Sequence, residues 1–297
     1  MKLTIVTATY KLVERHQEEM VRRCIESVKA LPFEHEHLLM DGASPDGTAA
    51  LLREIAAGDP TIQVHSEPDT GIYDAFNKGL AKATGDYIYF LGADDYIFDP
   101  AAMQAALDKV IAEHADIVVS PIRFRGKNCP KHQSDTYKIF SRMTCNHQGT
   151  ITRTEMLRKI NGFSLVCKIA SDHRSTISML LHGAKLVCNW QHYTEFADGG
   201  ISCDSRSITV EDDITGMADV YSITLKEARA LWADGVFPRR RLSIFNDLNS
   251  QSAIRAVRYL MRNLVFCKVH RGRWSVYRIF NIPILILPRV RRHHENI

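Results

Sequence analysis

The sequence predicts an α/β fold in which a mostly parallel central sheet is covered by helices on both faces. Over the first 120 residues, short runs rich in β-branched and aromatic side chains alternate with segments whose apolar residues recur at helical spacing. Repeated strand and helix units of this kind favour parallel strands joined by helical crossovers. The run 87–91 is apolar throughout, which is typical of a strand covered on both sides.

The expected elements follow one another regularly up to residue 120. The strands are expected at 3–7, 37–40, 62–65, 87–91 and 117–120. The helices are expected at 18–31, 48–57, 72–83 and 100–114. Beyond residue 120 the pattern loosens. Residues 123–140 predict an irregular antiparallel excursion, residues 145–164 predict a short strand, a helix and a turn, and another helix is expected to begin near Asp172.

The composition is that of a soluble globular protein, with 45% apolar and 24% charged residues among 297. Seven cysteines without a C-x-x-C pair argue against a disulfide framework and against a zinc knuckle. The N-terminal stretch is too short and too polar for a secretory signal peptide, so we expect a cytoplasmic protein. No G-x-G-x-x-G follows the first strand, which makes a dinucleotide-dependent oxidoreductase a weak alternative.

Polar side chains follow three of the predicted strands. They are the segment 7–10, which holds Thr7, Thr9 and Tyr10, then Asp41, and then the pair Asp94 and Asp95. Parallel strands bring their carboxyl ends to one edge of a sheet, so we expect a ligand site there. Two adjacent carboxylates repel each other unless a cation lies nearby. Capping of the helix that begins at Pro100 is an equally good interpretation of this pair.

Three further polar residues have simple structural interpretations. Asp74 and Lys78 lie off the apolar stripe of the helix 72–83, as solvated residues do. Asp172 stands at a helix start, where it or Ser171 would serve as a cap.

Six stretches, in this order and at this spacing, resemble the family 2 glycosyltransferases, the inverting class with the Rossmann-like GT-A fold. They are "LTIVTATYK", "LLMDGASPDGT", "SEPDTGIYDAFNKGLAKATGDYIYFLGADDYI", "HQGTITR", "FSLVCKIASDHR" and "FADGGIS". The "GIYDAFNKG" form is similar to that of the subgroup that builds exopolysaccharide, colanic-acid-like and O-antigen repeats. The resemblance covers about the first 205 residues.

The resemblance implies a role for each of six residues. Thr9, Tyr10 and Asp41 are expected to bind the nucleotide, with the Asp41 carboxylate accepting from a uracil N–H group. Asp94 and Asp95 are expected to form the acidic metal motif for Mg²⁺ or Mn²⁺, and Asp172 is expected to be the catalytic base.

The chain departs from the family pattern at three places. Gly92 stands where many relatives have an acid, which favours Asp95 as the direct metal ligand and assigns Asp94 to the ribose or to metal-bound water. Phe76 stands where many relatives have arginine. The contact of that arginine with the base or a phosphate is therefore absent here or is supplied by Lys78. The pair His173-Arg174 replaces an aromatic residue and an acid, which leaves the acceptor contacts open.

The chemistry of sugar transfer explains these residue types. A divalent ion on one or two carboxylates stabilises a departing diphosphate, and a carboxylate on the opposite face accepts the proton of the attacking hydroxyl. We further hypothesise that His147 and the segment 199–202 close over the diphosphate, because paired glycines allow close approach of backbone to phosphate. A buried, hydrogen-bonded His147 in an ordinary loop is an equal alternative.

The remaining residues, 206–297, are expected to form a helical, basic region after a catalytic domain of residues 1–205. Residues 239–297 hold 13 Lys and Arg against two acids, a net charge of +11, whereas residues 1–238 carry −7. The spacing from Ile254 to Val265 predicts a basic amphipathic helix. The apolar run 279–288 is far shorter than the roughly 20 residues of a spanning helix. Attachment to an anionic membrane surface and packing on the catalytic domain both remain open.

The sequence thus predicts a metal-dependent inverting hexosyltransferase that uses a nucleotide-sugar donor, in particular a UDP-sugar. Its acceptor is expected to be a growing or lipid-linked glycan of bacterial surface polysaccharide, including lipopolysaccharide, at the inner face of the cell membrane. A non-catalytic nucleotide-sugar or glycan binding protein is the alternative, against which the three acids Asp94, Asp95 and Asp172 argue. Nucleic-acid binding by the tail is less favoured, since few aromatic residues accompany the arginines.

Overall fold

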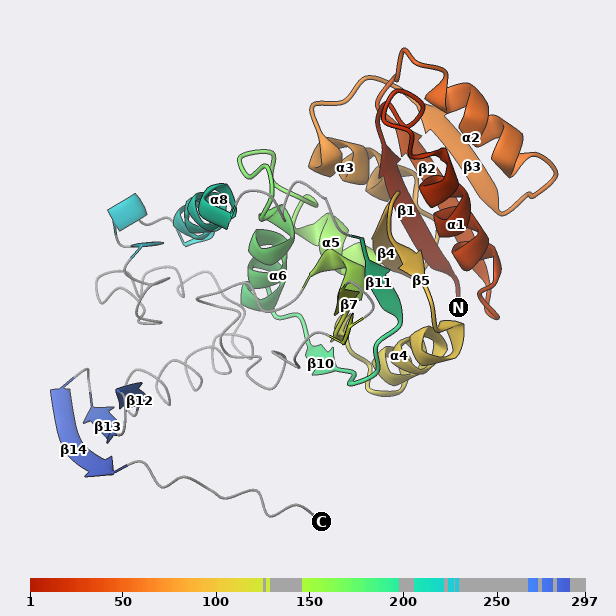
Figure 1. Cartoon of the computed structure of the whole chain (residues 1–297). Helices are drawn as coiled ribbons and strands as arrows, with labels where there is room; N and C mark the ends of the chain where they lie inside the picture. Colours follow the sequence, from red (N-terminus) through yellow and green to blue (C-terminus); the bar gives the residue numbers. More distant parts are fainter. Residues whose placement is uncertain are drawn as a thin grey trace.

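The structure is a computed structural model of the chain. It describes residues 1–124, 146–197, 206–221, 224–226 and 228–229, with the side chains of 206–209 excepted, together with the backbone of 127–128 and three strands between 267 and 288. It confirms the predicted α/β fold, with a central twisted sheet flanked by helices (Figure 1).

The central sheet has seven strands in the order β10-β6-β9-β4-β1-β2-β3. These strands are β1 (Leu3–Thr9), β2 (His35–Asp41), β3 (Ile62–Ser66), β4 (Tyr87–Gly92), β6 (Ile117–Val119), β9 (Thr150–Arg153) and β10 (Leu186–Cys188). All neighbours pair in parallel except β9, which runs antiparallel to both β4 and β6. The expected strands were therefore correctly located. The structure extends four of them by one to three residues and ends the fifth, β6, one residue earlier, at Val119.

Helices cover both faces of the sheet, as their apolar stripes require. One face is packed by α1 (Glu18–Lys29), α2 (Thr48–Ala56) and α4 (Pro100–Ala112). The other face is packed by α3 (Ile72–Lys82), α5 (Thr154–Lys159) and α6 (Ser171–Leu181). Side chains alternate along β1, so that Leu3 and Ile5 join the first layer and Val6 joins the second. The strands are thereby held rigidly, with their carboxyl ends at one edge.

A second, smaller sheet lies beside that edge, in the order β5-β11-β7-β8. Its strands are β5 (Tyr96–Ile97), β11 (Thr194–Phe196), β7 (Arg123–Phe124) and β8 (Lys127–Asn128). The β7–β8 pair is antiparallel, as the sequence predicted for this region, although residues 125–126 and 129–145 lie outside the described part. The β5–β11 pairing brings the chain at residue 197 back to the end of β4.

The chain beyond the predicted boundary at residue 205 begins with a helix, α8 (Arg206–Val220), which packs on α6. The contact is apolar and includes Ile177, Leu181, Ile214, Met217 and Tyr221. Farther on, the structure differs from the expected helical region. It has a three-stranded antiparallel sheet of β12 (Cys267–Arg271), β13 (Trp274–Ile279) and β14 (Ile282–Pro288). The alternation of β-branched and aromatic residues in these runs suits strands better than helices.

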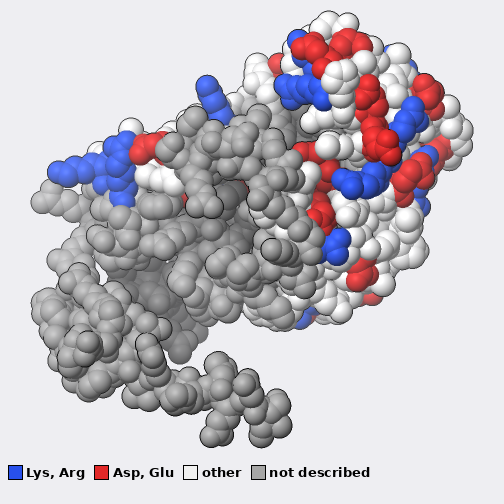
Figure 2. Space-filling view, in the orientation of Figure 1, with Lys and Arg blue, Asp and Glu red and all other residues white. Residues whose placement is uncertain are grey.

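The amphipathic helix expected from Ile254 and the glycine segment 199–202 both lie outside the described residues. Among the helices that are described, none combines the length and apolar character that crossing a membrane requires. On the face seen in Figure 2, acidic and basic side chains are interspersed over the residues drawn in colour.

Candidate active site

The register of the central sheet brings the predicted polar residues to one edge. Thr9 pairs with Asp41 across β1 and β2, Asp41 pairs with Ser66 across β2 and β3, and Ala8 pairs with Gly92 across β1 and β4. The carboxyl ends of four neighbouring strands are therefore level. This is the position where open α/β sheets bind ligands.

Asp41 is the most fully bonded acid at this edge. Its carboxylate is 2% exposed and accepts hydrogen bonds from the Ser44 amide at 3.1 Å, the Ser44 hydroxyl at 2.5 Å and the Ser66 hydroxyl at 2.6 Å. Since a carboxylate has about four acceptor positions, three are already occupied by the chain itself. Asp41 fixes the loop after β2 against the end of β3.

Asp69 is a second acid at this end, which the sequence analysis did not single out. A side chain at Gly42 would meet Asp69 Oδ2 at 2.6 Å and Tyr10 Cδ2 at 3.2 Å, so carboxylate and ring converge on the same space beside Gly42. The Tyr10 ring is 46% exposed, and burial raises the pKa of the Asp69 carboxyl above its ordinary value. The Gly71 amide donates to Oδ1 at 2.9 Å, while Oδ2 faces Gly42. The signal in the sequence was the "SEPDTG" stretch after β3.

Thr7 and Thr9 lie deeper than predicted. Because β1 continues to Thr9, Thr7 is inside the strand, where it is fully buried and its hydroxyl is 2.9 Å from His37 Nε2. The Thr9 hydroxyl donates to the Met40 carbonyl at 3.4 Å. Both side chains support the sheet, and Tyr10 is the residue of this segment that reaches the surface.

Asp94 and Asp95 converge on the space above Gly92. A Cβ atom at this position would lie 2.5 Å from Asp95 Oδ2 and 2.9 Å from Asp94 Oδ1. A side chain at this position would therefore displace the carboxylates from this arrangement. Helix capping does not explain the pair, since Asp99 caps α4 by accepting from the Ala102 amide at 2.9 Å.

The two acids have different surroundings. Asp95 is 1% exposed, and its oxygens accept from Gln148 Nε2 at 3.0 Å and from the Ala197 amide at 2.8 Å. Burial and the neighbouring Asp94 charge raise the pKa of Asp95 to about 6. Asp94 is partly exposed, and within the described residues no lysine or arginine pairs with either carboxylate. Two converging acids without a cationic partner fit a divalent cation.

No group of three or more His, Cys, Asp or Glu side chains converges as a metal site within the described residues. The Asp94 and Asp95 pair therefore offers part of a coordination shell. Mg²⁺ commonly takes one or two protein carboxylates and completes its shell with phosphate oxygens and water.

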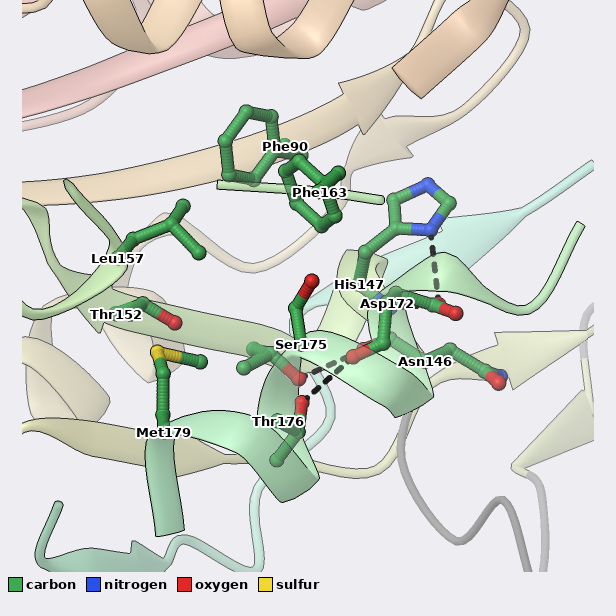
Figure 3. Close-up of a pocket in the computed structure, with 11 residues that line it drawn as sticks. Phe90, Asn146, His147, Thr152, Leu157, Phe163, Asp172, Ser175, Thr176 and Met179 are labelled. Carbon is green, nitrogen blue, oxygen red and sulfur yellow. Dashed lines mark hydrogen bonds and ion pairs between the residues drawn. The ribbon is translucent and has the colours of Figure 1, made fainter. Parts of the chain in front are cut away.

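Asp172 lies in the first turn of α6, 8% exposed, and is bonded to the short 3₁₀ helix η2 (His147–Gly149) (Figure 3). Its Oδ2 accepts from the His147 amide at 3.2 Å and lies 3.3 Å from His147 Nδ1. Its Oδ1 accepts from the His173 amide at 2.8 Å and lies 3.5 Å from the Tyr73 hydroxyl. Neither Asp172 nor Ser171 forms a side-chain cap of α6, whose N-cap residue is Ala170.

A small cavity of about 20 Å³ lies behind Asp172, lined by apolar and hydroxyl side chains such as Phe163, Ser175 and Met179 (Figure 3). This volume suits about one water molecule and is far below that of a sugar. The cavity beside Asp172 is therefore too small to hold a sugar.

The helix η2 joins the two groups of acids. His147 bonds to Asp172, and the next residue, Gln148, bonds to Asp95. The base predicted for catalysis and the acid predicted for the metal motif are therefore held by adjacent residues of one short segment. Gln148 was missed by the sequence analysis, although it follows His147 in the "HQG" stretch.

Comparison with known proteins identifies the family. The sequence model of Glycosyl transferase family 2 matches residues 4–171, more than half of the chain. The chain belongs to this family. The match includes Tyr10, Asp41 and the Asp94–Asp95 pair, and it ends one residue before Asp172.

Individual proteins give a consistent result. An uncharacterized glycosyltransferase of Mycobacterium tuberculosis is 28% identical over 216 residues, covering 68% of this chain and 79% of the relative. A PGL/p-HBAD biosynthesis glycosyltransferase of Mycobacterium bovis is 29% identical over 190 residues, covering 60% and 72%. The structure of Staphylococcus aureus TarS 1–349 with UDP-GlcNAc superposes with a TM-score of 0.62 at 17% identity, covering 88% and 81%. Mannosyltransferase PcManGT of Pyrobaculum calidifontis with GDP-Man and Mn²⁺ gives 0.61 at 16%, covering 87% and 74%. These structural likenesses confirm the GT-A fold.

The helix α3 of this family 2 glycosyltransferase carries two of the predicted donor contacts. Asp74 accepts from the Thr70 amide at 2.9 Å and lies 3.8 Å from Lys78 Nζ, and Lys78 also donates to the Pro68 carbonyl. Both side chains are thus tied to the loop 67–71 after β3. Phe76, where many relatives have arginine, is fully buried and packs on the Phe90 and His147 rings. Phe76 therefore makes no polar contact with a donor.

Proposed function

We propose that this protein is a metal-dependent inverting glycosyltransferase that transfers a sugar from a nucleotide-diphosphate donor, in particular a UDP-sugar. The observation that carries the proposal is the bridge through η2, which holds Asp172 on one side and Asp95 on the other. In-line displacement at a sugar carbon by this mechanism requires a carboxylate that acts as general base and an acidic metal motif that stabilises the leaving group.

We propose that the nucleotide binds at the end formed by Tyr10, Asp41 and Asp69. Tyr10 offers an exposed ring against which a base can stack, and Asp69 Oδ2 is available to accept from a base N–H group. Asp41, with three intrachain donors, keeps one acceptor position for the uracil contact expected from the sequence. The complexes of TarS with UDP-GlcNAc and of PcManGT with GDP-Man support a nucleotide-sugar donor by analogy of fold.

The diphosphate is placed beside Gly92, where the two acids converge. We assign the direct metal contact to the partly exposed Asp94 and a supporting position to the enclosed Asp95, which reverses the order expected from the sequence. A bound Mg²⁺ or Mn²⁺ supplies stabilisation of the negative charge on the departing nucleotide. The Mn²⁺ in the PcManGT structure supports this choice of cofactor.

Asp172 is the base of the proposed reaction. Its carboxylate accepts the proton of an acceptor hydroxyl while the hydroxyl oxygen bonds to the anomeric carbon and the bond to the diphosphate breaks, which inverts that centre. The amides of His147 and His173 hold the carboxylate oxygens in place. Because the His147 amide and ring also bond to Asp172, we propose that His147 supports the base, and its closure over the diphosphate stays a prediction.

The acceptor is proposed to be a growing or lipid-linked glycan at the inner face of the cell membrane, with residues 239–297 in contact with anionic lipid. The net charge of +11 in this segment supports the proposal, because each basic residue near an anionic surface adds about 1 kcal/mol. Flotation of the full chain with anionic but not with neutral liposomes is the expected result.

The function is tested by screening UDP- and GDP-sugars for Mn²⁺-dependent thermal stabilisation and then for release of free nucleotide with candidate acceptors. Asp172→Asn is expected to bind the donor normally and to lose turnover by about 10²–10⁴-fold, as removal of a general base does. Asp108→Asn, an exposed acid on α4, is the matched control and should retain full turnover. Donor binding without nucleotide release by the wild-type chain would identify a non-catalytic binding protein instead.

A further inference from the structure

The segment before the proposed base is held by a single acid of α8. The Asp212 carboxylate accepts three successive backbone amides, from Lys168 at 2.9 Å, Ile169 at 2.7 Å and Ala170 at 2.7 Å. These amides precede the first turn of α6, whose N-cap residue, Ala170, has no side-chain acceptor. The Asp212 carboxylate, about 40 positions away in the sequence, thus holds the backbone immediately before the helix, up to and including the N–H group of the N-cap residue.

A second acid of α8 reaches the residue that follows the base. The His173 amide donates to Asp172 Oδ1 at 2.8 Å, and its ring Nδ1 pairs with Asp213 Oδ1. Since a carboxylate only accepts, Nδ1 carries the proton in this pair. The ring is fully buried, so its orientation is fixed. His173 therefore links α8 directly to a carboxylate oxygen of Asp172.

The two helices also approach closely. A Cβ atom at Gly216 of α8 would lie 2.9 Å from Cys167 Sγ and 3.4 Å from Arg174 Cβ. Arg174 pairs with Asp219 at 2.6 Å on the same side of the contact. Glycine at this position lets α8 sit against the segment 167–174, which brings Asp212 and Asp213 within reach of it.

We infer that α8 positions the catalytic base, and that Asp212 and Asp213 are positioning residues for the transfer reaction. The inference rests on the proposed function, in which Asp172 is the catalytic base. It also gives a physical account of the departure from the family pattern after "SD". The basic pair His173-Arg174 is matched by Asp213 and Asp219 on a helix that lies beyond the family match.

The consequence for catalysis is geometric. A base has to lie within hydrogen-bond reach of the attacking hydroxyl, and a displacement of about 1 Å can cost about 10²-fold in rate. Asp212 fixes the backbone before Asp172, and Asp213 fixes the residue after it. Neither acid lies at the strand ends where the nucleotide is placed, so their loss should leave donor binding intact.

The test uses the full chain and three variants. Asp212→Asn replaces one accepting oxygen by an NH₂ group facing amide donors. Asp213→Ala removes the carboxylate that pairs with His173 Nδ1, and Asp213→Asn keeps an acceptor for it. The measurements are kcat and KM for UDP release from the UDP-sugar that stabilises the wild type most, Mn²⁺-dependent binding of UDP alone, and the unfolding temperature. Glu211→Gln is the control, because this exposed residue of α8 pairs only with Arg229 among its described partners.

Asp212→Asn and Asp213→Ala are expected to lower kcat about tenfold or more, with KM for the donor and UDP binding within about twofold of wild type. Asp213→Asn should retain most of the activity, and Glu211→Gln all of it. Should Asp212→Asn fail to fold, the comparison of Asp213→Ala with Asp213→Asn decides in the same way. Unchanged kcat in Asp212→Asn and Asp213→Ala, alongside inactive Asp172→Asn, would overturn the inference alone. Full turnover by Asp172→Asn would instead overturn the proposed function.

Discussion

Two buried carboxyl groups lie at opposite ends of the central sheet and have opposite electrostatic surroundings. Glu36, near the amino end of β2, is 3% exposed, and Asp95, after the carboxyl end of β4, is 1% exposed. Burial by itself would raise the pKa of both carboxyl groups, because it disfavours the charged form. Around Glu36, hydrogen bonds from Lys2, Thr4 and Thr84 outweigh burial and lower its pKa to about 2. Around Asp95, burial and the Asp94 charge outweigh two hydrogen bonds and raise its pKa to about 6.

We interpret the difference as one between a structural acid, Glu36, and acids that we propose to act in the site, Asp94 and Asp95. Glu36 has four donors, including an ion pair with Lys2 at 2.8 Å, and it ties the starts of β1 and β2 to the loop before β4. The stability of the sheet depends on such a satisfied charge. We interpret the unfavourable arrangement of the two acids above Gly92 as one that the proposed divalent cation relieves.

The largest effect is expected from removing Asp94. Asp94→Ala should abolish the Mn²⁺-dependent stabilisation and lower turnover by about 10²-fold or more, since several kcal/mol of leaving-group stabilisation are lost. Its unfolding temperature without metal should stay equal to that of the wild type or rise, because one of two repelling charges is gone. Thermal shift with and without Mn²⁺ measures both. If Asp94→Ala keeps the Mn²⁺ effect while Asp95→Ala loses it, Asp95 is the direct ligand.

The next effect concerns the other end of the sheet. Glu36→Gln should destabilise the fold by about 2 kcal/mol, because a buried charged acceptor with several donors is replaced by an amide that puts an NH₂ group among them. Mn²⁺-dependent binding of UDP should be unchanged in the folded fraction. Chemical denaturation measures the free energy of unfolding. A loss of donor affinity without a loss of stability would contradict the division between the two ends.

The fold and part of the site were predictable from local patterns. Strand positions follow from short apolar runs, and the strand-end rule correctly brought Tyr10, Asp41 and Asp95 to one edge. The rule could not predict how deeply each side chain is buried. The strand β1 runs two residues farther than its apolar pattern predicts, so Thr7 lies in the core. The resemblance indicated Asp172, but neither pattern nor motif showed what holds it.

The residues that were missed act across long sequence distances. Gln148 reaches Asp95 from 53 residues away, and Asp212 reaches Ile169 from 43. Such contacts depend on how α6, α8 and η2 pack, which no local spacing contains. The domain boundary at residue 205 stays a prediction, and the apolar contact between α6 and α8 crosses it. Periodicity also failed to distinguish helix from strand over 267–288.

A smaller effect is expected at the nucleotide end. Asp69→Asn should weaken UDP binding about tenfold, the equivalent of roughly 1.4 kcal/mol, because an amide can replace only part of a carboxylate's acceptance from the base. Asp59→Asn is a matched control, as this acid only caps the turn at Thr61. Calorimetric titration with UDP and with GDP measures the affinity. Equal binding of UDP by Asp69→Asn and the wild type would leave Asp41 as the base-reading acid.

The smallest effect is a change in how stability depends on pH. The folded-state pKa of Asp95 is raised, so the protonated carboxyl favours the native state, and its contribution is complete below about 4 and lost as the pH rises through about 6. Asp95→Asn should remove this decline and be as stable as the wild type, or up to about 1 kcal/mol more stable, at pH 7. The Gln148 amide can turn to accept from the new NH₂ group, since it offers both a donor and an acceptor. The contribution of Glu36 to stability depends on pH in the opposite direction. Because its pKa is lowered, Glu36 stabilises the fold above about pH 4.5, and this stabilisation is lost as the pH falls towards 2. Unfolding free energies of the wild type and of Asp95→Asn between pH 4 and 7 measure this change in pH dependence. Parallel curves would mean that the acids above Gly92 do not strain the native state.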